Sequence, residues 1–184
     1  MIIFGLTGKN AAGKGTVANI LMEKGFVYHS LSDTLRDELK LLNREETREN
    51  LIGIGNKLRE EGGPGVLADK LIGKLNSENN HIVDSIRNPL EVDSLREKSS
   101  SHEFMLIAVD ADARLRYERL CSRSRIGDTD SWEIFVEQEK QEENNDDPNK
   151  QQLSKTMILA DYNIDNSGTL ADLKQQVKNI ISEL

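Results

Sequence analysis

A seven-residue segment near the start of the chain constrains its fold more than any other feature. Residues 8–14 read Gly-Lys-Asn-Ala-Ala-Gly-Lys and fit the pattern G-x-x-x-x-G-K. The apolar run over residues 1–6 predicts a buried strand before it, and apolar residues at helical spacing over 17–24 predict a helix after it. In this setting small residues let consecutive backbone N–H groups surround phosphate oxygens, and the helix dipole adds to the attraction. The segment therefore predicts a phosphate-binding loop, with Lys14 reaching the β- and γ-phosphates.

The residue after the loop lysine departs from the usual pattern. Gly15 stands where a serine or threonine is common, and Thr16 follows one position later. Residues 13–16 resemble the loop of adenylate kinase and its relatives. This resemblance implies that Thr16 contacts a phosphate and is not a direct ligand of Mg²⁺. The residues expected to contact ATP at this loop are Gly8, Asn10, Ala11, Ala12, Gly13, Lys14, Gly15 and Thr16.

The rest of the chain alternates short apolar runs with helical patterns, which is typical of βα units around a mostly parallel sheet. Further strands are expected at residues 26–30, 81–84, 104–109 and 162–165. Helices are expected at residues 45–59, 66–75, 114–125, 132–143, 151–160 and 170–184, and Ser32 is expected to cap another. No repeat or long linker interrupts the pattern, and 184 residues suit one domain. We therefore expect a single α/β domain over residues 1–184.

The charge of the chain is concentrated in one segment. The formal net charge is −8, and residues 127–150 hold nine acids against two bases. The remainder is nearly neutral, so a local positive pocket for an anionic nucleotide is compatible with the composition. The acidic balance and 4% aromatic content argue against nucleic-acid binding. We expect the acidic segment to oppose closure over a nucleotide, so that neutralising its acids tightens nucleotide binding.

Cysteine, histidine and hydropathy narrow the class further. Cys121 is the single cysteine and the three histidines are scattered, which argues against a disulfide and a metal cluster. No stretch approaches the roughly 20 apolar residues of a membrane helix. The apolar run at the start is too short for a signal peptide. We expect a soluble, cytoplasmic protein with neither a membrane nor a nucleic-acid partner.

Arginines and carboxylates at element ends suggest phosphoryl transfer, which needs charge stabilisation more than covalent chemistry. Residues 32–36 resemble the start of the acceptor-binding segment of nucleoside monophosphate kinases. That resemblance implies that Arg36 holds the acceptor phosphate and that Asp33 lies near the metal or acceptor. By position alone, a solvated arginine in an amphipathic helix is the favoured interpretation of Arg36, and the resemblance reverses that preference. Asp84 follows a central strand, where such enzymes order the waters of a metal, so we expect it to bind Mg²⁺ through water.

Residues 84–92 resemble the deoxynucleoside monophosphate kinases and the P-loop domain that accompanies some deoxycytidylate deaminases. The resemblance implies a second grip on the acceptor phosphate by Arg87. It also offers Glu91 as a reader of the acceptor base or sugar, with a helix first-turn acid as the alternative. Arg59 is a further candidate for contact with the acceptor. The acceptor-binding segment would span residues 32–75.

A basic helix carries the third group of candidates. Its arginines are Arg114, Arg116, Arg119, Arg123 and Arg125. Arg119 and Arg123 are four residues apart and share one helical face. In nucleoside monophosphate kinases two such arginines approach the base and the γ-phosphate from the helix that enters the lid, here about residues 120–150. A basic surface face is the alternative, and no arginine follows Arg125, so the lid is reduced or lysines substitute without the bidentate fork.

Residues 160–169 resemble the segment before the last helix of dephospho-CoA kinase, whose backbone packs on adenine. This implies ATP contacts by Asn166 and Gly168, with a simple turn as the alternative.

Together these resemblances predict a three-layer P-loop fold with a five-stranded parallel sheet, a helical acceptor-binding segment and a lid. The implied reaction transfers the γ-phosphoryl group of ATP, with Mg²⁺, to a nucleoside or deoxynucleoside monophosphate. The residues expected to carry it are Lys14, Arg36, Asp84, Arg87, Arg119 and Arg123. One alternative is dephospho-CoA kinase, in which a carboxylate such as Asp33 must act as base. Another is a nucleotide-binding regulatory domain without turnover, and either a monomer or a homodimer fits the sequence.

Overall fold

A computed structural model of the chain describes residues 1–99, 103–123, 129, 131–143 and 147–184. Its five strands form one sheet in the order β2-β3-β1-β4-β5. Every neighbouring pair is parallel. The strands are β1 (Ile2–Gly8), β2 (Val27–Ser30), β3 (His81–Asp84), β4 (Glu103–Asp110) and β5 (Tyr162–Asp165). The predicted five-stranded parallel sheet is confirmed.

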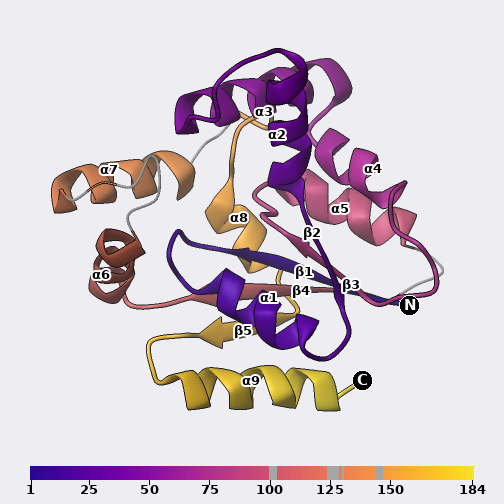
Figure 1. The fold of residues 1–184 in the computed structure, drawn as a ribbon, viewed down its shortest axis with the longest axis vertical. Helices are drawn as coiled ribbons and strands as arrows, with labels where there is room; N and C mark the ends of the chain where they lie inside the picture. Colours follow the sequence, from indigo (N-terminus) through magenta and orange to yellow (C-terminus); the bar gives the residue numbers. More distant parts are fainter. Residues whose placement is uncertain (100–102, 124–128, 130, 144–146) are drawn as a thin grey trace.

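Helices surround this sheet in three groups (Figure 1). They are α1 (Lys14–Met22), α2 (Leu31–Leu41), α3 (Arg48–Gly62), α4 (Val66–Ile72), α5 (Pro89–Lys98), α6 (Ala113–Arg123), α7 (Trp132–Glu143), α8 (Leu153–Ile158) and α9 (Leu170–Ser182). Helices α1 and α9 cover one face. Helices α4, α5 and α8 cover the other, with α2 and α3 packed on α4, and α6 and α7 stand beside the sheet (Figure 1). Among the described residues, no helix is both long and apolar enough to cross a membrane.

The central strand explains why the sheet forms in this order. All but the first residue of β1 are buried, as expected for a parallel strand covered on both faces. Its side chains alternate between two cores: Phe4 and Leu6 pack with α1 and α9, and Ile3 packs with the opposite layer. The Thr7 hydroxyl donates to the Ile86 carbonyl at 2.8 Å. This bond ties the end of β1 to the segment that follows β3.

Local signals set most helix ends. Helix α5 begins with a capping box in which Asn88 and Glu91 bond each other's backbone, and α9 begins with another built from Thr169 and Asp172. Residues 63–65, Gly-Pro-Gly, separate α3 from α4. The cap of α2 is Ser30 instead of Ser32, because the helix starts directly where β2 ends.

Candidate active site

The phosphate loop joins β1 to α1 and depends on two glycines. Gly8 has φ +135°, and a Cβ there would lie 2.0 Å from the Val109 carbonyl oxygen. Gly13 has φ +105°, and its Cβ would lie 2.1 Å from Nδ2 of Asn166. Only glycine fits both the conformation and the space at these positions. Gly13 is also the N-cap of α1 and brings no side chain that competes with a phosphate for the first helical amides.

Lys14 reaches back across this loop. Its Nζ donates to the carbonyl oxygens of Gly8 at 2.6 Å and Lys9 at 2.9 Å. Ala11, between them and the helix, has φ 57°, which a non-glycine residue adopts rarely. Strained backbone of this kind is concentrated at ligand sites, where surrounding contacts maintain it.

A cavity of about 630 Å³ opens above the loop at the carboxyl ends of the strands. Its lining residues are Asn10, Ala11, Gly13, Lys14, Gly15, Thr16, Ala18, Asn19, Met22, Tyr28, Ser32, Arg36, Asp84, Ser85, Arg87, Arg119 and Arg123. All six predicted catalytic residues are among them. Five of these six are cationic and Asp84 is the carboxylate, so the cavity is positive in a chain of net charge −8. Such a cavity suits a polyanionic ligand.

Asp84 is held from two sides at the end of β3. Its Oδ1 accepts from the Ser85 N–H at 2.6 Å, and its Oδ2 accepts from the Tyr28 hydroxyl at 2.9 Å. Burial, reinforced by the negative charge of Asp84, raises the pKa of Tyr28. The phenol therefore stays protonated at neutral pH and donates to the carboxylate. Ser85 has φ 68°, a second left-handed non-glycine residue in the cavity wall.

Arg36 and Arg87 reach the cavity from separate segments. Arg36 donates to Glu46 at 2.7 Å and to Asp33 at 2.8 Å. The Glu46 bond is the main cause of a raised pKa of Arg36, so the side chain is a permanent cation. Arg87 donates to Oε1 of Gln151 at 3.1 Å. Asp33 is not a lining residue, because its carboxylate is exposed and paired with Arg36.

The two arginines of α6 contact the phosphate loop and its support. Arg123 donates to Oδ1 of Asn10 at 2.9 Å, and Arg119 donates to the Asn166 carbonyl at 2.8 Å. Nη1 of Arg119 is buried and meets no hydrogen-bond partner among the described residues. An unsatisfied buried N–H is unfavourable, so an oxygen of a bound ligand would stabilise this side chain.

Asn166 and Gly168 lie behind the loop and do not line the cavity. Nδ2 of Asn166 donates to the Ala12 carbonyl at 2.8 Å, which makes this side chain a support of the phosphate loop. A Cβ on Gly168 would approach the Asp172 carboxylate to 2.9 Å. Gly168 therefore fits the turn interpretation, next to the cap of α9.

The structure corrects the predictions for Arg59 and Glu91. Both are buried, with exposed fractions of 5% and 0%, and neither lines the cavity. Glu91 accepts from Arg59 at 2.9 Å and from the backbone N–H groups of Arg87 at 2.9 Å and Asn88 at 3.1 Å. Its oxygens are thus already bonded within the protein. Glu91 is the first-turn acid of α5, and Arg59 is its partner.

Two residues near the site were not selected from the sequence. Tyr28 lines the cavity from the second residue of β2. Arg116 is almost fully buried at 1% exposure, next to the phosphate loop. The spacing 116, 119, 123 on one helix face was a usable signal for it. Of the predicted basic helix and lid, Arg125 and positions 124–128, 130 and 144–146 lie outside the described residues.

A phosphate loop after the central strand of a 2-3-1-4-5 parallel sheet defines a P-loop protein with a kinase-like fold. Shikimate kinase from Bacteroides thetaiotaomicron has a TM-score of 0.60, at 16% identity over 100% of this chain and 99% of that one. A gluconokinase from Sinorhizobium meliloti 1021 has a TM-score of 0.55, at 12% identity over 98% and 95%. At such identities the likeness shows the fold alone.

Sequence comparison gives the family. A profile described as an AAA domain matches residues 5–147. The UPF0200 protein PF1294 of Pyrococcus furiosus is 32% identical over 181 residues, which cover 96% of this chain and 94% of that protein. The chain therefore belongs to the AAA domain family and, at full length, to the UPF0200 family.

Proposed function

We propose that this protein is an ATP-dependent kinase that phosphorylates a nucleoside or deoxynucleoside monophosphate. One observation carries the proposal: a single cavity joins the phosphate loop to Arg36 and Arg87, two arginines from separate segments. Arginine forks bind phosphate bidentately, so two of them facing a donor loop suit an acceptor that itself carries phosphate.

The donor side would hold ATP by its phosphates. Loop amides and Lys14 would bind the β- and γ-phosphates, as the loop geometry indicates. Arg119 and Arg123 would neutralise charge that develops on the transferring group, and the unpartnered Nη1 of Arg119 would gain an oxygen. The family resemblance also implies Mg²⁺. Mg²⁺ usually takes one or two carboxylates plus phosphate oxygens and waters, and Asp84 supplies a fixed carboxylate in the cavity wall.

The proposed reaction requires no general base. An acceptor phosphate oxygen is already deprotonated at neutral pH, and it forms a bond to the γ-phosphorus of ATP. The bond from that phosphorus to the β–γ bridging oxygen breaks, and ADP leaves with the electron pair. Mg²⁺, when bound, would offset negative charge on the phosphate oxygens. Arg36 and Arg87 would hold the acceptor in line with the leaving group.

A hydroxyl acceptor, as in dephospho-CoA kinase, is less well supported. It needs a carboxylate base beside the hydroxyl. Asp33 is paired with Arg36 outside the cavity lining, and Asp84 already accepts from Tyr28 and Ser85. This arrangement favours the phosphate acceptor.

ATP consumption with a panel of acceptors tests the proposal. The panel should contain ribo- and deoxynucleoside monophosphates, dephospho-CoA, shikimate and gluconate, because kinases for the last two share the fold. We expect turnover with a nucleoside monophosphate. Phosphorylation of dephospho-CoA, shikimate or gluconate alone would overturn the acceptor assignment. Tight ATP binding with no acceptor phosphorylated would instead support a regulatory domain.

A further inference from the structure

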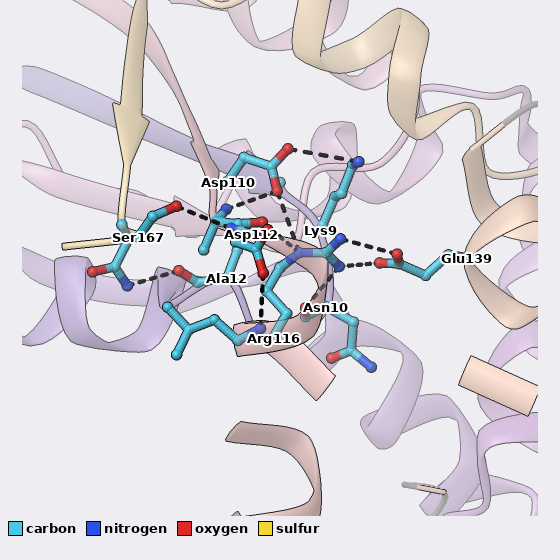
Figure 2. Close-up of polar contacts among 12 residues, drawn as sticks. Lys9, Asn10, Ala12, Asp110, Asp112, Arg116, Glu139 and Ser167 are labelled. Atoms are coloured by element: carbon cyan, nitrogen blue, oxygen red, sulfur yellow. Dashed lines mark hydrogen bonds and ion pairs between the residues drawn. The ribbon is translucent and has the colours of Figure 1, made fainter. Parts of the chain in front are cut away.

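A buried arginine joins three parts of the molecule beside the phosphate loop (Figure 2). Nε of Arg116 donates to the Ala111 carbonyl at 2.8 Å and lies 3.5 Å from the Asp110 carboxylate, at the end of β4. Its guanidinium also bonds both carboxylate oxygens of Glu139, with Nη2 to Oε2 at 3.0 Å. Its Nη1 lies 3.5 Å from the carbonyl oxygen of Asn10 in the phosphate loop.

Glu139 brings helix α7 into this cluster. The glutamate side chain is 16% exposed, so the pair is largely shielded from water. Phe135, one turn earlier on α7, packs under the Arg116 guanidinium at 5.5 Å from the ring centre. Arg116 therefore docks α7 through both its charge and its flat face.

The contact with Asn10 bears on phosphate binding because of peptide geometry. The Asn10 carbonyl and the Ala11 N–H belong to one planar trans peptide, so they point in opposite directions. Because Arg116 contacts the Asn10 carbonyl from outside the loop, the N–H of Ala11 is turned toward the cavity. Asn166 makes the same kind of contact on the Ala12 carbonyl, whose peptide partner is the N–H of Gly13. Both Ala11 and Gly13 line the cavity.

We propose that Arg116 is a positioning residue of the phosphate loop and that Glu139 holds it in place, so that α7 docking and phosphate binding stabilise each other. Linkage between two binding events is reciprocal, so an ion on the loop strengthens docking by the factor by which docking strengthens binding. This proposal rests on the proposed function only in requiring that the loop bind nucleotide phosphates. Neutralising the acids of residues 127–150 was expected to tighten nucleotide binding. For Glu139 the proposal predicts the opposite: neutralising it should weaken binding.

Trp132 makes the coupling measurable. It is the single tryptophan of the chain and begins α7. Its ring lies 5.3 Å from Tyr117 and 5.1 Å from the Arg114 guanidinium, both on α6. Release of α7 would separate these groups and expose Trp132 to a soluble quencher such as acrylamide.

The experiment compares Glu139→Gln with Glu137→Gln on the same helix. Glu137 is exposed and accepts from Gln141 on the same helix, so its replacement removes one charge at a distance from the Arg116 cluster. Affinity for MgADP and for inorganic tripolyphosphate is measured by calorimetry, and Trp132 quenching is followed with and without each. We expect Glu139→Gln to weaken both ligands about tenfold, a common size for coupling between sites. Quenching should rise in that variant, and Glu137→Gln should match the wild type within about twofold on both measures.

Each outcome decides the matter. Unchanged tripolyphosphate affinity in Glu139→Gln, with greater Trp132 quenching, would reduce the pair to a structural contact and overturn the proposal. If Glu139→Gln does not fold, Glu139→Asp keeps the charge but is one methylene too short to bond Arg116 with both oxygens. It should weaken both ligands about threefold, and unchanged affinity would overturn the proposal. Wild-type protein that binds phosphates but phosphorylates no acceptor would leave this coupling intact and overturn only the proposed function.

Discussion

Two arginine–glutamate pairs, each with a buried arginine, support different sides of the cavity, and they do so in opposite ways. On the side of Arg87, proposed to hold the acceptor, Glu91 is the centre: it accepts from Arg59 and from the backbone N–H of Arg87. On the side of the phosphate loop, proposed to hold the donor, Arg116 is the centre: it donates to Glu139 and to the Ala111 carbonyl, and lies against the Asn10 carbonyl. The Glu91 carboxylate accepts from backbone N–H groups, whereas the Arg116 guanidinium contacts backbone carbonyl oxygens. In each case one ion pair links a helix to a loop that lines the cavity.

The largest effect expected leaves both pairs untouched. Lys14→Ala removes a cation of the phosphate loop whose Nζ donates to the carbonyl oxygens of Gly8 and Lys9. We expect kcat/KM to fall about 10³-fold, as when one charge-stabilising group is removed from a transition state. The melting temperature should remain that of the wild type. Transfer that persists in folded Lys14→Ala protein would contradict the whole donor-side assignment.

The next effect separates the pairs by burial. Glu91→Gln leaves the nearly buried Arg59 without its counter-charge, so we expect the free energy of unfolding to fall by about 3–5 kcal/mol. Glu139→Gln should reduce it by about 1–2 kcal/mol, because Glu139 is partly hydrated and Arg116 keeps its carbonyl partners. Urea denaturation followed by circular dichroism measures both. Equal losses in the free energy of unfolding would contradict the argument that the difference in burial sets the cost of removing each carboxylate.

The residues that line or support the cavity differ in whether local sequence patterns could predict them. The phosphate loop was predictable because its glycines, lysine, strand and helix are contiguous. Asp84 and the pair Arg119 and Arg123 followed from local rules, namely the end of a strand and the spacing on a helix face. The cap role of Glu91 was equally local and stood as the alternative to an acceptor contact.

The partners of Glu91 and Arg116 were not predictable in this way. Arg59 and Glu91 are 32 residues apart, and Arg116 and Glu139 are 23 apart. In the sequence each arginine has the spacing of an ordinary exposed helix residue, and each glutamate has several neighbours of like charge. Which of them meet is decided by tertiary packing and not by local pattern: α4 packs against both α3 and α5, and aromatic contacts join α7 to α6.

Replacing Arg116 or Arg59 by lysine should change the KM of different substrates. Lysine keeps the charge but cannot bond two or three oxygens in one plane. We expect Arg116→Lys to raise KM for ATP about fivefold with little change in KM for the acceptor, and Arg59→Lys to do the reverse through Arg87, both at the lower end of site coupling. Steady-state kinetics with each substrate varied in turn measures this. A rise in the same KM for both variants would contradict the division of labour.

The smallest effect concerns an ion pair that, unlike these two, lies at the surface. Arg36 bonds Glu46 and Asp33, whose side chains are 53% and 57% exposed. Exposed pairs contribute about 0–1 kcal/mol, so Glu46→Gln should change the free energy of unfolding by less than about 0.5 kcal/mol. It does remove a carboxylate that competes with the acceptor phosphate for Arg36, so KM for the acceptor should fall about twofold at low salt, and the difference should vanish as salt screens the charges. Glu45→Gln, which removes the same charge one residue earlier, is the control for a general charge effect. An equal fall in the acceptor KM of both variants would assign the change to net charge. A raised acceptor KM in Glu46→Gln alone would mean that Glu46 orients Arg36 for the acceptor, as Glu139 is proposed to hold Arg116 for the donor.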